Sequence, residues 1–167
     1  MRRFFALALV ACLCSSCWTF YGGDDDYLYT TPYEAVTIPR ADFENAVVLE
    51  SPRAVINAGK IYVKDDFLFI NEKEAGVHIY NNADVTAPVA VAYIPILGNT
   101  DIAVKNNTIY AHHMTDLIAF QYSAFNNRLR MRNRLQNVFP GLVSPDGFNA
   151  ASYNIPTDHV LVGYRPL

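Results

Sequence analysis

The chain has 167 residues, the size of one ordinary domain. Apolar residues make up 51% of it and charged residues 17%, which excludes a chain that is disordered throughout. The formal net charge of −3 argues against a nucleic-acid partner, because such a partner needs a basic face. Aromatic residues reach 13%, a composition that favours β-structure.

Residues 1–17 have the pattern of a secretory signal peptide. Arg2 and Arg3 precede an apolar run over residues 4–13. That run is shorter than the roughly 20 residues of a membrane-spanning helix. A basic start followed by a short apolar run is typical of an export signal, so we expect the protein to leave the cytoplasm.

Cys17 is the predicted lipidation site. The stretch Cys14-Ser15-Ser16-Cys17 resembles the lipobox of bacterial lipoproteins, which implies that Cys17 is acylated and becomes the mature N-terminus. Cys12, which follows Leu9-Val10-Ala11, is the alternative lipidation site, and a plain secretory signal is a further alternative. The resemblance implies an exported protein that is lipid-anchored in the bacterial cell envelope. The outer membrane is the expected location, and the sequence leaves two alternatives, its periplasmic face and its surface face.

No cysteine follows Cys17, so disulfides, cysteine–zinc sites and thiol catalysis are not expected in the mature domain. Without Arg2 and Arg3, 11 of the 13 basic residues remain against 16 acidic ones, a net charge of −5. We therefore expect the acyl chains, and not charge, to hold the protein at the membrane.

Residues 18–46 are expected to form an acidic, tyrosine-rich tether. Asp24, Asp25 and Asp26 follow two glycines near its start. Such an acidic run resembles the surface-export signal of some Gram-negative lipoproteins, and a solvated linker is the alternative.

A sequence repeat follows. Residues 61–69 match residues 102–110 at a spacing of 41, and residues 76–80 match residues 116–120 at a spacing of 40. A gap of one residue in the intervening loop reconciles the two spacings.

Each repeat is predicted to form four short strands. Asp65-Asp66 and Asn106-Asn107 supply turn residues that tolerate positive φ, as a two-residue hairpin requires. Four strands in about 40 residues is the period of a β-propeller blade. The predicted fold is therefore all-β, with about two four-stranded propeller-type blades in residues 47–139, at about 53–96 and 97–139. A further strand is expected at 47–49.

The repeats resemble the LVIVD-repeat proteins, a propeller-like family of secreted and lipid-anchored bacterial proteins. The resemblance spans about residues 53–139 and is carried by Gly59–Val63, Phe67–Glu72, Gly76–Tyr80, Ala87–Val89 and Gly98–Val104. Gln121-Tyr122-Ser123 departs from the family pattern. The resemblance implies propeller-type blades and brings no catalytic residue.

The repeat is too short to close a ring by itself. A closed propeller needs at least four blades, or about 160 residues, and some 90 residues carry the repeat. Three alternatives remain: a part of a ring that self-associates through open blade edges, an open two-sheet domain, or a truncated copy of a longer protein. Residues 140–167 are rich in Pro and Gly, yet 160–164 is a predicted strand, so this tail is a candidate start of a further blade.

Arg128, Arg130, Arg132 and Arg134 alternate with other residues, and period-two spacing predicts that all four guanidinium groups lie on one face of a strand. One interpretation is an outer strand whose charges discourage aggregation. The other is a contact site for anions or for an anionic glycan.

The adjacent histidines His112 and His113 are expected at a blade rim, on the surface. Neighbouring residues of a strand point to opposite faces, so the pair is not expected to chelate one metal ion.

These observations predict a protein without a metal, cofactor or catalytic residue. The expected function is a non-catalytic, lipid-anchored interaction module for a protein or glycan partner. The alternative is a truncated piece of a larger propeller protein, enzymatic through residues in blades that this chain lacks.

Overall fold

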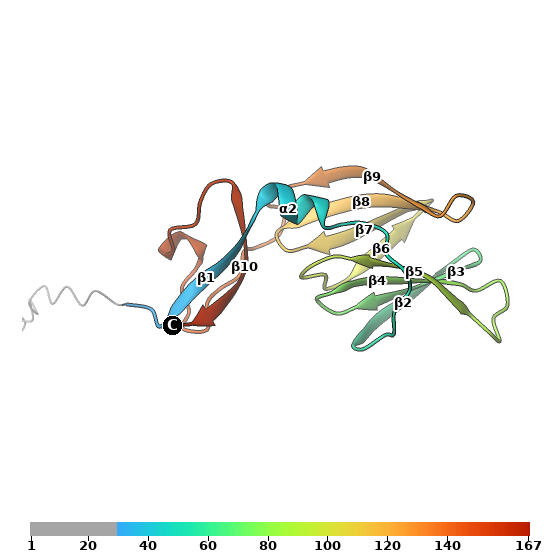
Figure 1. Ribbon diagram of the computed structural model, residues 1–167, viewed down its shortest axis with the longest axis horizontal. Coiled ribbons are helices and arrows are strands. Elements are labelled where there is room, and N and C mark those ends of the chain that lie inside the picture. The colour runs from blue at the N-terminus through green and yellow to red at the C-terminus, as the bar shows by residue number, and fades with distance from the viewer. Residues whose placement is uncertain (1–29) are drawn as a thin grey trace, which may run out of the picture. The chain divides into compact units, whose positions relative to one another are not determined.

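Two four-stranded antiparallel sheets form most of the fold in the computed structural model, which describes residues 30–167 (Figure 1). The predictions for the signal peptide, for Cys12 and Cys17 and for the acidic run lie outside the described residues. Residues Thr31–Leu167 form one compact unit. Within the described residues, no helix is long and apolar enough to cross a membrane.

The first sheet is a meander in which consecutive strands pair in the order β2-β3-β4-β5. Asp65 turns the chain between β2 and β3 with a φ of 52°, as the predicted hairpin requires. The strands are β2 (Ala58–Lys64), β3 (Phe67–Glu72), β4 (Gly76–Asn81) and β5 (Val89–Pro95).

The second sheet repeats this arrangement in the order β6-β7-β8-β9. Asn106, with a φ of 54°, makes the turn equivalent to that of Asp65. The prediction of two four-stranded antiparallel units is confirmed, and the sheets do not close into a barrel. The strands are β6 (Ile102–Lys105), β7 (Thr108–His113), β8 (Asp116–Ser123) and β9 (Arg128–Leu135).

A third, two-stranded sheet joins the two ends of the described chain. Strand β1 (Tyr33–Pro39) pairs antiparallel with β10 (His159–Pro166). The prediction of a tether as far as residue 46 was therefore wrong after residue 32, because β1 and helix α2 (Arg40–Asn45) occupy this region. The predicted strand at 160–164 is confirmed, but it pairs with β1 and begins no further four-stranded sheet.

The strand expected at 47–49 does not form. Val47 is buried in the core, and the only strand-like pairing of this segment is a bridge between Glu50 and Tyr93 of β5. The segment runs past the first sheet and adds no complete strand to it.

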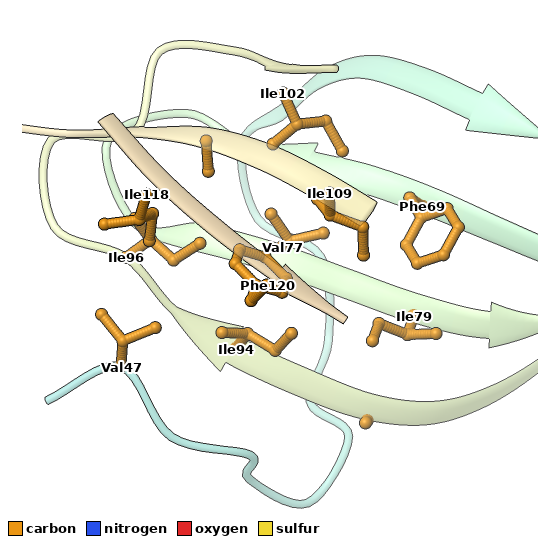
Figure 2. Close-up of a cluster of buried hydrophobic side chains, with 12 residues drawn as sticks. Val47, Phe69, Val77, Ile79, Ile94, Ile96, Ile102, Ile109, Ile118 and Phe120 are labelled. Carbon is orange, nitrogen blue, oxygen red and sulfur yellow. The ribbon is translucent and has the colours of Figure 1, made fainter. Parts of the chain in front are cut away.

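The core lies between the first and second sheets (Figure 2). Phe69 and Ile79 from the first sheet pack in one buried cluster with Ile109 and Phe120 from the second. Burial of such apolar side chains contributes about 1.5–3 kcal/mol each.

The two sheets contribute opposite faces to this core. At the repeat spacing of 41, Ile109 corresponds to Leu68 and Tyr110 corresponds to Phe69. Ile109 and Phe69 lie in the core, whereas Leu68 and Tyr110 lie on the faces that point away from it. The sheets therefore stack head to tail, as successive copies of one unit do.

Candidate functional site

A buried cluster of charged groups lies where helix α2 meets the end of the second sheet. The Asp116 side chain is fully buried and accepts hydrogen bonds from Arg40 Nη1 at 2.6 Å and from Arg134 Nη1 at 2.8 Å. The backbone N–H of Asn137 donates to the other carboxylate oxygen at 3.2 Å. Burial alone raises the pKa of Asp116, but the two guanidinium groups and this N–H outweigh it and lower the pKa.

His113 completes the cluster as a neutral imidazole. Its Nδ1 lies 3.0 Å from Arg134 Nη1, and a guanidinium can only donate, so Nδ1 is the acceptor. The ring stacks on Phe43 of α2, with centroids 3.7 Å apart. Burial, reinforced by the charge of Arg134, lowers the pKa of His113 to about 3. The cluster thus fastens α2 to the sheet.

The prediction that four arginines share one face of a strand was wrong. A bulge interrupts the pairing of β9 with β8 between Ala119 and Phe120. Beyond this bulge Arg134 pairs with Ile118 and points to the core side, where it joins Asp116. A bulge shifts the alternation by one residue, which a strict period of two cannot anticipate.

Arg128 and Arg130 stay together on the solvent side. They pair with Ser123 and Gln121 of β8 and line a polar crevice of about 460 Å³. Arg132 is also exposed but lies at the bulge and does not line the crevice. Two guanidinium groups beside amide and hydroxyl groups suit a carboxylate or sulfate ligand.

A second buried polar group lies on the first sheet. Glu72 accepts hydrogen bonds from the backbone N–H of Asn57 at 2.6 Å and from His78 Nε2 at 2.5 Å. Burial raises the pKa of Glu72, but these donors outweigh it and lower the pKa. Beside it, Arg53 stacks on the ring of Tyr93 at 3.6 Å. Together these contacts hold residues 50–57 against one end of the first sheet.

The expectation of two surface histidines holds only for His112. Its Nδ1 donates to the carbonyl of Gly98 at 2.8 Å, and its ring meets Phe139 edge-on at 4.4 Å. His113 is buried on the opposite face of β7, so the two rings point apart as predicted. Among residues 30–167, no three His, Cys, Asp or Glu side chains form a group that could hold a metal ion.

An exposed apolar surface lies on the side of the first sheet that points away from the core, and we call it the open face. Its pairs across β2 and β3 are Ile61 with Ile70 and Val63 with Leu68. Ile61 is 57% exposed and Val63 is 64% exposed. None of the sequence patterns described above predicts this surface. The pattern that could have indicated the open face is the near-continuous apolar run of β3, because such a run is typical of strands that are covered on both faces.

Comparison of the chain with protein-family models, with curated proteins and with solved structures finds no match. The resemblance to the LVIVD-repeat proteins therefore stays a prediction.

Proposed function

We propose that this chain is a non-catalytic interaction module of the bacterial cell envelope. It is built from two propeller-type blades and held at a membrane by acyl chains on Cys17, with Cys12 as the alternative. The partner, a protein, binds the open face of the first sheet. The blade assignment is supported by two four-stranded meanders that stack head to tail through apolar faces.

The observation that carries the proposal is the open face itself. A folded domain rarely leaves apolar strand residues such as Ile61 and Val63 in water on a sheet whose other face is a packed core. Contiguous exposed apolar surface of this kind marks a site for another macromolecule. The two buried carboxylates of the described residues, by contrast, are engaged within the domain: Asp116 binds two arginines and Glu72 binds His78.

Photo-cross-linking in cells tests this proposal. A photoreactive amino acid replaces Val63 on the open face, and a matched variant carries it at Val85, an exposed loop residue that is 74% accessible. We expect a discrete cross-linked product from residue 63 and none from residue 85. Equal, diffuse labelling from both positions would show that the open face is not a binding surface.

The crevice beside Arg128 and Arg130 favours a second candidate, the binding of an anionic glycan. Its support is the pairing of two exposed guanidinium groups next to Gln121. This binding is independent of the open face, which lies on the other sheet.

A further inference from the structure

We infer that the partner of the open face is a second copy of this chain, which contributes the outer face of its second sheet. This inference rests on the proposal that the open face is a binding surface. The sequence repeat identifies this partner, because the residues of the two uncovered faces correspond, repeat to repeat, to the residues of the two faces that meet in the core.

The open face carries the same apolar pattern as the core side of the second sheet. A spacing of 41 relates the four open-face positions to four positions that belong to the hydrophobic core or pack against it. In order, Ile61, Val63, Leu68 and Ile70 correspond to Ile102, Val104, Ile109 and Ala111.

The outer face of the second sheet likewise copies the core side of the first. Spacings of 41 and 40 relate four core-side residues to four apolar residues that point away from the core. In order, Tyr62, Phe69, Val77 and Ile79 correspond to Ala103, Tyr110, Leu117 and Ala119. Ala103, Tyr110 and Leu117 line a crevice of about 420 Å³ on this outer face. The surface is therefore concave where the sheet of a second copy would pack.

The part of the open face that is already covered does not stand in the way. On the second sheet, Phe43 of α2 covers the end at His113, and the first sheet covers the rest of that face. On the first sheet, residues 50–57 cover the equivalent end at Glu72 and leave the rest open. The uncovered part of the open face is thus equivalent to the part of the second sheet that the first sheet covers inside the chain.

Charge favours the same arrangement. Inside the chain, the turn at Asp65 and Asp66 lines one crevice together with Asn107 of the second sheet. Lys64, beside this turn, lines the same crevice. In a stack of two copies, the equivalent of the relation between Lys64 and Asn107 sets Lys105 of one copy beside Asp66 of the other. Opposite charges then meet at the rim of an apolar contact, which fixes its register.

Head-to-tail contacts are heterologous and generate a ring where the rotation closes. Each copy supplies two sheets, and propellers hold four to eight blades. The expected assembly is therefore a closed ring of two to four copies.

Sedimentation equilibrium of residues 18–167, the chain without its signal peptide and acyl chains, tests this inference. We expect a discrete dimer, trimer or tetramer. Val63→Glu and Tyr110→Glu, which place a charge on the two different faces, should each give monomers. Val85→Glu, a matched substitution in an exposed loop, should leave the assembly unchanged. Thermal melts of the monomeric variants verify that they fold.

Mixing the two monomeric variants gives the decisive result. The Val63→Glu chain keeps an intact outer face and the Tyr110→Glu chain keeps an intact open face, so a head-to-tail contact predicts a one-to-one heterodimer. No heterodimer, or a wild-type monomer, would overturn the inference. A wild-type monomer that associates only when shortened to residues 31–167 would show that residues 18–30 of the chain cover the face. If residue 63 still cross-links to a different protein in cells, the proposed function survives and only the second copy is rejected.

Discussion

Arg134 and Asp116 lie 2.8 Å apart on adjacent strands, and this ion pair is almost completely removed from water. The carboxylate also binds Arg40, the first residue of α2. One buried acid therefore ties the helix to strands β8 and β9 of the second sheet, and the fold depends on it more than on any exposed charge pair.

Replacement of Asp116 by Asn should cost about 3–5 kcal/mol, because it leaves Arg40 and Arg134 without a counter-charge in a buried place. Urea unfolding followed by circular dichroism measures this loss. Asp66→Asn is the matched control at an exposed turn, and we expect it to change the free energy of unfolding by less than about 0.5 kcal/mol. Equal losses for the two variants would show that the cluster is not structural.

Acid should destabilise the domain well above the range in which ordinary carboxylates titrate. The pKa of His113 falls from 6.5 to about 3 on folding, so the unfolded chain takes up the proton first. Stability is therefore full above about pH 6.5 and is lost as the pH falls toward 3. The lowered pKa values of Asp116 and Glu72 add a further loss at more acidic pH, below about 4.

The slope of this loss identifies His113. One proton gives at most about 1.4 kcal/mol per pH unit between pH 6.5 and 4.5. His113→Gln retains an acceptor for Arg134 but no titrating ring, so its urea midpoint should vary less over this range. The same pH dependence in the wild type and in this variant would assign the effect to another group.

Charge reversal at both Arg128 and Arg130 should weaken the binding of a sulfated glycan such as heparin at least about tenfold, because both guanidinium groups of the crevice are lost. Arg132→Glu, at the bulge, is the control for a general change of charge. Titration calorimetry at moderate salt distinguishes them. If all variants bind as the wild type does, or if the wild type does not bind, the crevice has no role in anion recognition.

Cys17→Ser should abolish incorporation of labelled palmitate in a bacterial host and release the protein from the membrane fraction. Cys12→Ser should leave both properties unchanged. The reverse result would move the lipidation site to Cys12, and retention of label by both variants would contradict lipid anchoring through either residue.

The sequence was a good guide to local structure and a poor one to long-range pairing. The alternation and spacing around Asp65 and Asn106 predicted both hairpins, because turn chemistry and strand pattern are local properties. The pairing of β1 with β10 was invisible, since the two strands are separated by more than 100 residues and neither belongs to the repeat. A tyrosine-rich, acidic start suggested a linker where a strand forms.

The same contrast between local and long-range features holds for the charged cluster around Asp116 and for the histidine pair. The opposite orientations of His112 and His113 follow from strand geometry and were predicted. The burial of His113 depends on Phe43, and the inward turn of Arg134 depends on a single bulge. Neither event leaves a local mark in the sequence, so the charged cluster could be found only from the structure.

The claim that the open face is covered in the envelope can be measured with one cysteine. Residues 18–167 contain none, so Val63→Cys introduces a single reactive thiol there, and Val85→Cys provides the exposed reference. In membranes, a soluble maleimide should label residue 85 quickly and residue 63 much more slowly, with equal labelling of both after denaturation. Equal labelling of both positions in native membranes would show that nothing covers the open face, and would contradict the account.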